Sequence, residues 1–240
     1  MMNYSLKMIC VEGSSHLFAC KGFSHLVALN KLKRTCLFKR QLYANLYKVD
    51  NYILKVCYGQ SIPKDVLRKY AFKSQAEREF KSAEILSQIG LKTPKSYFSA
   101  FSLFPLTKGW VESIHEMEFL HGFEDLNPDF IHRPDCLKII SCFAKDLAII
   151  TNAMFCPKDL GLGNTMFNPK QVELAWLDTD LKKITNRKKL AVKMMSQLRP
   201  RFFRYLNRHQ AEMFWAVFCE TSNLYPEKEE LLISAGIKEF

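Results

Sequence analysis

The segment Pro157–Asp180, PKDLGLGNTMFNPKQVELAWLDTD, carries most of the information about the fold of this chain. Asp159 and Asn164 lie five residues apart, on a stretch that two glycines interrupt. The residues that follow predict two short strands around an Asn-Pro turn, because apolar and aromatic residues flank a dipeptide that favours turns. Asp178 stands at the end of the second strand. The stretch therefore predicts a loop and a small hairpin with polar groups at both ends.

Carboxylate and amide oxygens in this order suit phosphoryl transfer. That reaction needs a carboxylate to accept the hydroxyl proton, and oxygen ligands to hold Mg²⁺ on the phosphates of ATP. We interpret Asp159 as the base and Asn164 and Asp178 as metal ligands, with Asp180 as a further ligand or a residue that supports one. Taken singly, each is more often a turn former, a cap or a strand-end acid, so the hypothesis depends on the rest of the chain.

Further toward the N-terminus, Lys55 interrupts the apolar strand YILKV. A buried ammonium group without a partner is costly, so this lysine either extends its amine to water or has a carboxylate partner. The next helix offers Glu77, Glu79 and Glu84, and apolar residues flank Glu79. A helix exposes its acids to solvent more often than it uses them. The functional hypothesis is that Lys55 contacts nucleotide phosphates while Glu79 holds it in place.

The first half of the chain predicts strands with one helix among them. Branched and aromatic residues recur at short spacing, an Asp-Asn pair predicts a hairpin turn, and a glycine ends the helical pattern. The expected elements are strands at Cys36–Gln41, Leu46–Val49 and Tyr52–Cys57, a helix over residues 73–90, an extended segment over 93–104 and a strand over 110–120.

The second half predicts helices on both sides of the small hairpin. An apolar stripe with helical spacing starts at Cys136 and breaks at Cys156-Pro157. After Asp180 the pattern is helical to the end of the chain. The class is therefore α+β, with a strand-rich N-lobe over residues 1–120 and a helical C-lobe over residues 121–240 that holds the catalytic loop and basic C-terminal helices.

Basic residues are concentrated in two parts of this 240-residue chain, whose net charge is +11. Ten Lys or Arg and no acid fall between Leu181 and Ala211, and seven with no acid fall between Gly13 and Val49. Such stretches attract polyanions: nucleic acid, anionic lipid or a phosphorylated glycan. The chain has no helix-turn-helix, zinc-finger or RNP-type motif, so we expect no nucleic acid partner.

Cysteine usage and hydropathy predict a cytoplasmic protein. The eight cysteines form no C-x-x-C pair, which favours free and mostly buried thiols in a reducing compartment. The six histidines lack metal-ligand spacing, so no zinc site is expected. Neither a signal peptide nor an apolar run of roughly 18 residues is present. We expect any contact with the inner membrane to be peripheral.

The order of these motifs resembles the lipopolysaccharide core kinase family, meaning the Kdo kinase and the inner-core heptose kinases. The matching pieces are YILKV, AEREFKSAEILSQIGLKTPKSYF, MEFLHGFEDL, KDLGLGNTMF and LAWLDTDL, with NRKKLAVKMMSQLRPRFFRYL similar to the family's tail. The resemblance as a whole extends over roughly residues 30–220. The resemblance implies a two-lobed, protein-kinase-like fold. It also implies transfer of a phosphoryl group from ATP, with Mg²⁺, to a sugar hydroxyl of the lipopolysaccharide core glycolipid, with heptose as the expected acceptor.

The resemblance also assigns roles to the residues singled out above. Lys55 would hold the α- and β-phosphates, and Glu79 would pair with Lys55. Asp159 would be the catalytic base. Asn164 and Asp178 would bind Mg²⁺. The residues whose main-chain groups would receive the adenine are Glu118, Phe119 and Leu120.

Three features depart from the family pattern. The segment CLFKRQLYANLYKVD before Lys55 contains no glycine, so side chains such as Lys39 or Arg40 would have to replace the usual phosphate-binding main chain. Pro157 stands where the family has His, and no aromatic residue separates Asp178 from Asp180. An alternative is therefore a catalytically degenerate pseudokinase that binds a nucleotide or a partner. A third hypothesis, nucleic acid binding, depends on the basic stretches alone.

Overall fold

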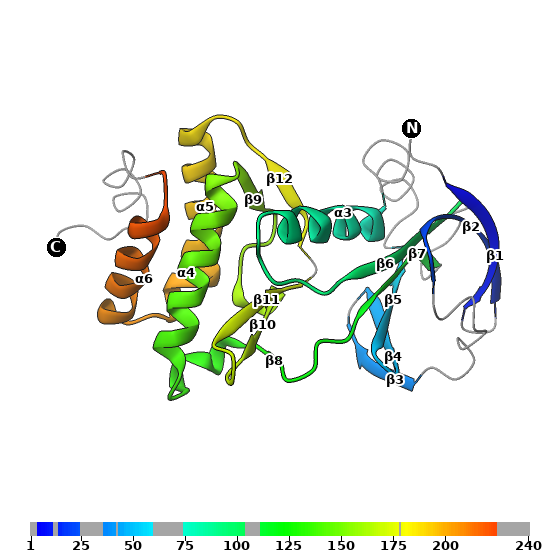
Figure 1. Cartoon of the computed structure of the whole chain (residues 1–240), viewed down its shortest axis with the longest axis horizontal. Coiled ribbons are helices and arrows are strands. Elements are labelled where there is room, and N and C mark those ends of the chain that lie inside the picture. The colour runs from blue at the N-terminus through cyan, green and yellow to red at the C-terminus, as the bar shows by residue number, and fades with distance from the viewer. Residues whose placement is uncertain are drawn as a thin grey trace. The chain divides into compact units, whose positions relative to one another are not determined.

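The computed structural model describes residues 4–11, 14–24, 36–41, 43–59, 74–103, 111–177 and 179–224. Two compact units divide the chain: Met1–Glu84 with Pro94–Leu120, and Ile85–Thr93 with His121–Phe240. Strands predominate in the first, here called the strand-rich unit, and helices in the second, the helical unit (Figure 1).

A seven-stranded sheet in the order β1-β2-β6-β7-β5-β4-β3 forms the strand-rich unit, and every neighbouring pair is antiparallel. The predicted hairpin is confirmed, since β4 pairs with β5 and Asp50 at their turn has a φ of 52°. The sequence analysis had not predicted β1 and β2 individually. The strands are β1 (Ser5–Val11), β2 (Ser14–Gly22), β3 (Cys36–Arg40), β4 (Ala44–Val49), β5 (Tyr52–Tyr58), β6 (Ser96–Ser102) and β7 (Val111–Glu118).

Close main-chain packing occurs where β2 ends beside β6. Gly22 has a φ of 85°, and a Cβ there would lie 2.2 Å from the carbonyl oxygen of Tyr97. Only glycine has both the conformational freedom and the small size that this position needs. The residue thus lets two strands of the sheet approach each other closely.

Helix α3 (Gln75–Gln88) confirms the helix predicted over residues 73–90. Ser74 and Glu77 form a reciprocal cap at its start: the Ser74 hydroxyl accepts from the Glu77 N–H at 3.3 Å, and Glu77 Oε2 accepts from the Ser74 N–H at 3.0 Å. At the other end Gly90 has a φ of 84°, the left-handed conformation that commonly stops a helix. Local signals therefore determine both ends.

Three α-helices and two small sheets form most of the described helical unit. The hairpin predicted around Asn168-Pro169 is confirmed by the pairing of β10 with β11. The helices are α4 (Cys136–Asn152), α5 (Arg187–Arg201) and α6 (Arg208–Thr221). The strands are β8 (Glu124–Asp125), β9 (Phe155–Pro157), β10 (Thr165–Asn168), β11 (Glu173–Trp176) and β12 (Leu181–Lys183).

Two predictions for the helical unit were wrong in detail. Helix α4 ends at Asn152 rather than at Cys156, because the chain reverses at Met154, whose φ is 64°. Residues directly after Asp180 form a strand, β12, rather than a helix, since they pair with β9. The predicted helical pattern holds in α5 and α6, and its last part, residues 225–240, lies outside the described residues.

An aromatic core joins the elements of the helical unit. Phe143 of α4 lies 4.8 Å from Phe202 and 5.5 Å from Trp176, measured between ring centroids. Phe214 of α6 packs against Phe202 at 5.4 Å. Leu160 is fully buried in the same core. The core therefore fixes the loop that carries Asp159 to the body of the unit.

Two further predictions concern the chain as a whole. The cysteines whose side chains are described are all free thiols, and Cys20, Cys57, Cys136 and Cys156 are buried. Across the described ranges, no helix combines the length and the apolar character needed to cross a bilayer.

Candidate active site

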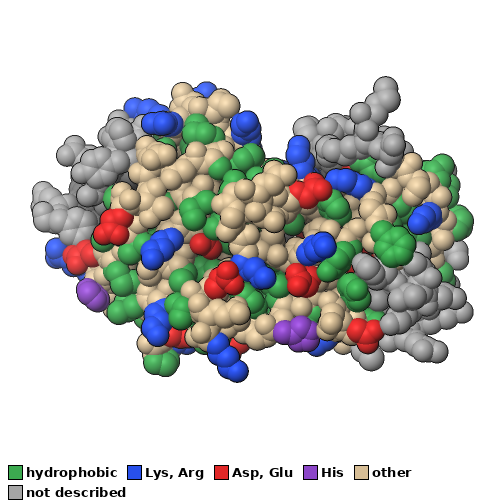
Figure 2. All heavy atoms as spheres, in the orientation of Figure 1, with side chains coloured by type: hydrophobic (Ala, Val, Ile, Leu, Met, Phe, Trp, Pro, Cys, Tyr) green, Lys and Arg blue, Asp and Glu red, His purple; other side chains and the backbone are tan. Residues whose placement is uncertain are grey.

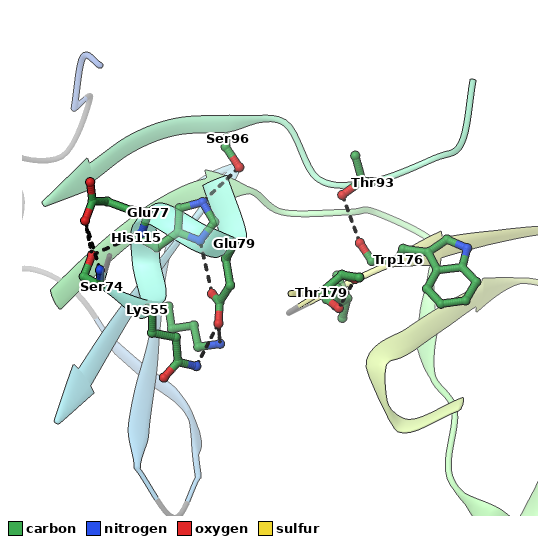
Figure 3. Close-up of polar contacts among 11 residues, drawn as sticks. Lys55, Ser74, Glu77, Glu79, Thr93, Ser96, His115, Trp176 and Thr179 are labelled. Carbon is green, nitrogen blue, oxygen red and sulfur yellow. Dashed lines mark hydrogen bonds and ion pairs between the residues drawn. The ribbon is translucent and has the colours of Figure 1, made fainter. Parts of the chain in front are cut away.

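Lys55 and Glu79 form a buried ion pair inside the strand-rich unit (Figure 3). Lys55 Nζ lies 2.9 Å from Glu79 Oε1, and the two residues are 1% and 5% exposed. Of the three acids on this helix, Glu77 caps the helix and Glu84 makes a half-exposed ion pair with Lys21. The expected pairing of Lys55 with Glu79 is therefore present.

Two further side chains hold the Glu79 carboxylate. His115 is the cross-strand partner of Lys55, so both side chains emerge from adjacent strands on one face of the sheet. His115 Nδ1 lies 3.4 Å from Glu79 Oε2, and its Nε2 lies 2.9 Å from Ser96 Oγ, with the ring standing between the two partners (Figure 3). Gln75 donates to Glu79 Oε1 at 2.8 Å. Lys55, His115 and Gln75 thus surround Glu79.

Neither His115 nor Gln75 is predicted as a site residue by the sequence. Strand β7 lies in the middle of the sheet and seven of its eight residues are buried, including Glu112, His115 and Glu116. The signal was present in VESIHEME, because several polar residues within a central strand must find partners inside the protein. Those partners lie on other elements, so the sequence did not reveal which they are.

Electrostatic interactions keep the Glu79 carboxyl ionised. Burial of the Glu79 carboxyl favours its neutral form, but the charge of Lys55, with the nearby His115 ring, outweighs burial and lowers the pKa of Glu79 to about 2. Glu79 is therefore ionised at neutral pH and Lys55 has a permanent anionic partner. A cation fixed in this way fits the role of a phosphate-binding group, because it need not reorganise when an anion arrives.

The segment expected to receive the adenine lies at the end of β7. The Glu118 N–H donates to the Lys95 carbonyl at 2.9 Å, and the Phe119 N–H donates to the Asn51 carbonyl at 2.8 Å. The Leu120 N–H makes no hydrogen bond with the described part of the chain. Of these three main-chain donors, the amide of Leu120 is the one that fits an adenine nitrogen.

In the helical unit, buried and exposed side chains alternate along the loop that carries Asp159. Leu160 and Leu162 are buried, whereas the Asp159 side chain is 68% exposed. Gln197 of α5 accepts a hydrogen bond from the Leu160 N–H at 2.8 Å. The two leucines therefore anchor the loop in the core and leave the Asp159 carboxylate in solvent, where it can meet a substrate.

Two main-chain hydrogen bonds join this loop to the segment on either side of residue 178. The Leu177 N–H donates to the Asn164 carbonyl at 2.8 Å, and the Lys158 N–H donates to the Asp180 carbonyl at 2.9 Å. Lys158 Nζ also lies 2.6 Å from Asp180 Oδ2. The structure thus brings together two segments that the sequence analysis had singled out.

The predicted magnesium ligands are described only in part. The Asn164 amide nitrogen donates to the Asp159 carbonyl at 2.8 Å, which leaves its side-chain oxygen for a cation. An amide oxygen is a ligand that Mg²⁺ accepts, so Asn164 fits its expected role. Asp178 lies outside the described residues, and its role stays a prediction. The residues in the described ranges contain no group of three or more His, Cys, Asp or Glu arranged to hold a metal ion.

A pocket of about 410 Å³ opens beside Asp159, and Asn164 also lines it. Arg201, at the end of α5, lies 2.6 Å from the Asp159 carboxylate and lines the same pocket. In the sequence, Arg201 stands out only as one of ten basic residues in an acid-free stretch, because nothing local marks a partner 42 positions away.

No protein-family model matches the chain, and a search of curated proteins finds no match either. Solved structures do resemble it. A structure of WaaP in complex with acyl carrier protein has a TM-score of 0.60 and 14% identity, covering 91% of this chain and 97% of that one. WbdD, co-crystallised with the kinase inhibitor LY294002, has a TM-score of 0.52 and 16% identity over 83% of this chain. The match spans 45% of that WbdD chain.

A further WbdD structure, described as a bifunctional kinase-methyltransferase, has a TM-score of 0.50 and 16% identity over 81% of this chain and 43% of that one. At these identities the likeness concerns the fold. The chain thus has an α+β, protein-kinase-like fold with a strand-rich and a helical lobe, as predicted. The fold expected of the lipopolysaccharide core kinase family is therefore confirmed.

Proposed function

We propose that this chain is an ATP-dependent phosphotransferase that phosphorylates a sugar hydroxyl of the lipopolysaccharide inner core, with a heptose as the acceptor. The observation that carries the proposal is the buried pair of Lys55 and Glu79. A charged pair in a sheet interior seldom adds net stability over apolar residues of the same size, which favours a functional reason for its presence. The kinase-like fold supplies the matching context.

Each group has one task in the proposed reaction. Lys55 binds the α- and β-phosphates, and Glu79 keeps its ammonium group in place. As the acceptor oxygen bonds to the γ-phosphorus, its proton passes to Asp159 and ADP leaves. Bound Mg²⁺ supplies charge neutralisation on the phosphates, and Asn164 and Asp178 would hold it.

The contacts of Asp159 favour one of its two carboxylate oxygens as the proton acceptor in the proposed reaction. Arg201 engages Oδ1 at 2.6 Å. Oδ2 makes no hydrogen bond or ion pair with the described residues. We assign proton transfer to Oδ2, while Arg201 orients the carboxylate.

Surface charge supports an anionic acceptor. All ten Lys and Arg side chains between Leu181 and Ala211 are exposed, and Figure 2 shows basic side chains spread over the face in view rather than gathered in one patch. Near an anionic membrane each basic residue contributes roughly 1 kcal/mol of attraction. This favours peripheral contact with the surface where such a glycolipid resides.

The decisive experiment combines labelled ATP, Mg²⁺ and purified core glycolipid. We expect the native chain to transfer label, and Asp159→Ala and Asp178→Ala to lose transfer while keeping the circular dichroism spectrum of the native protein. The proposed phosphotransferase activity would be refuted if the native chain labels no core acceptor, or if the variants keep the full rate of transfer.

The second candidate is a pseudokinase, which the glycine-free segment before Lys55 favours. Nucleotide binding separates the two. An enzyme should bind ATP more tightly when Mg²⁺ is present, whereas a pseudokinase that lacks the metal site should bind it equally with and without the metal.

A further inference from the structure

The pocket beside Asp159 has a lining that the transfer of a phosphoryl group does not by itself require. The described residues that line it belong to the helical unit and come from three segments. Asn127 and Pro128 come from the start of a short 3₁₀ turn, Asp159 to Asn164 from the loop, and Arg201, Arg204 and Tyr205 from the end of α5 and the turn after it. The base is thus one wall of a cavity large enough for a sugar.

The charge of this lining is basic. Among the described residues that line it, Asp159 is the one acid, against the two guanidinium groups of Arg201 and Arg204. Arg204 is exposed, donates a hydrogen bond to the Tyr205 hydroxyl, and places its guanidinium carbon 4.5 Å from the centre of the Tyr205 ring. Contact with the ring restrains the guanidinium group near the pocket and leaves other N–H donors for a ligand.

The loop leaves open space at the border of this pocket. Gly163 lines it, and a Cβ at this position would meet no atom within 4 Å. The absence of a side chain here keeps volume next to Asp159 and Asn164 for a bound molecule.

We propose that this pocket binds the phosphoryl acceptor, and that Arg201 and Arg204 recognise an anionic group on it, a phosphomonoester or a carboxylate, while a hydroxyl of the same molecule faces Asp159. This inference rests on the proposed function and specifies the substrate class. Guanidinium groups match both anions, because their N–H donors form paired hydrogen bonds with two oxygens. A neutral sugar would leave Arg204 without such a partner.

Direct binding tests the proposal without any transfer step. Isothermal titration calorimetry of the full chain without nucleotide, at about 0.15 M salt so that distant surface charges are screened, would compare mannose 6-phosphate, glucuronate and mannose. We expect an anionic sugar to bind and mannose not to bind at the same concentrations. The two anionic probes distinguish a phosphomonoester from a carboxylate as the recognised group.

Variants then locate the site. Arg204→Gln should weaken binding of the anionic sugar at least about tenfold, the effect of losing one charge-assisted hydrogen bond. Arg199→Gln is the matched control, because Arg199 is an exposed residue of α5 that does not line the pocket. It should change affinity less than about twofold, as expected of a surface charge screened by salt.

The inference would be overturned if no sugar binds, or if mannose binds as tightly as the anionic sugars. It would also be overturned if Arg204→Gln and Arg199→Gln weaken sugar binding equally, or if Arg204→Gln weakens the binding of ATP rather than that of the sugar. The proposed function fails separately. If anionic sugars bind as expected and no core acceptor is ever labelled, the pocket specificity stands while the kinase activity does not. If label is transferred without any preference for anionic acceptors, the kinase activity stands while the pocket specificity does not.

Discussion

Replacing Glu79 with Gln should destabilise the fold by about 3 kcal/mol. Gln keeps the shape of the side chain and removes its charge, so the Lys55 ammonium, in a residue 1% exposed, would be buried beside a neutral group. Breaking a buried pair by removing one partner costs roughly 3–5 kcal/mol. The lowered pKa of Glu79 has the same sign, because the folded state favours its ionised form.

Urea denaturation at pH 7 would measure this loss against a control on the same helix. Glu84→Gln removes an ion pair of 3.4 Å whose two side chains are 27% and 49% exposed, so it should cost no more than roughly 1 kcal/mol. The double variant Lys55→Met with Glu79→Leu should be more stable than Glu79→Gln, because it leaves no unpaired buried charge. Equal losses for Glu79→Gln and Glu84→Gln would refute the reasoning.

Acid titration gives the same prediction a signature in pH. The pKa of Glu79 is lower in the folded state than in the unfolded state, so its contribution to stability is complete above about pH 5. It is lost as the pH falls through the folded-state pKa, about 2. Glu79→Gln should lack this part of the acid-induced decline, and an unchanged decline in the variant would count against the assignment.

Three further outcomes can be checked. Gly22→Ala should lower the free energy of unfolding, measured with urea, by at least about 2 kcal/mol, because its Cβ would lie 2.2 Å from a carbonyl oxygen. Gly163→Ala should keep the native unfolding midpoint. Equal midpoints for the two variants would contradict this prediction. Burial raises the pKa of Asp146 to about 7 despite a hydrogen bond from Trp176. Asp146→Asn should therefore have a higher melting temperature than the native protein at pH 8 and the same melting temperature at pH 4. Equal melting temperatures at pH 8 would contradict the raised pKa of Asp146. Asp159→Asn should change the free energy of unfolding by less than about 1 kcal/mol, since the side chain is 68% exposed. The same variant should lower the rate of phosphoryl transfer at least about 100-fold. A smaller loss of rate would argue against Asp159 as the base.

Features with local signals could be predicted from the sequence. The turn at Asp50, the capped helix that carries Glu79 and the hairpin after Asn164 each depend on neighbouring residues, and each is present in the structure. The pairing of Lys55 with Glu79 was also predictable, because an ammonium in an apolar strand needs a carboxylate and the next helix supplies few.

Features that depend on distant partners could not be predicted. Strand β12 has three residues and exists because β9 lies beside it. His115 reaches Glu79 through its position opposite Lys55 on an adjacent strand. Arg201 meets Asp159 across 42 positions of sequence. In each case the partner is determined by tertiary packing, which local patterns do not encode.

The contrast between a buried Glu79 and an exposed Asp159 has a consequence for how such chains diverge. Losing either member of the Lys55–Glu79 pair leaves a buried charge unpaired, so mutational drift would be opposed there even after catalysis had ceased to matter. A change at the exposed Asp159 should cost the fold little, so under the proposed function only selection for transfer would preserve it. In a set of descendants, the pair would therefore persist for stability as well as for function. Under the proposed function, persistence of the aspartate would report activity, and its loss would mark the lineages that have stopped transferring phosphate.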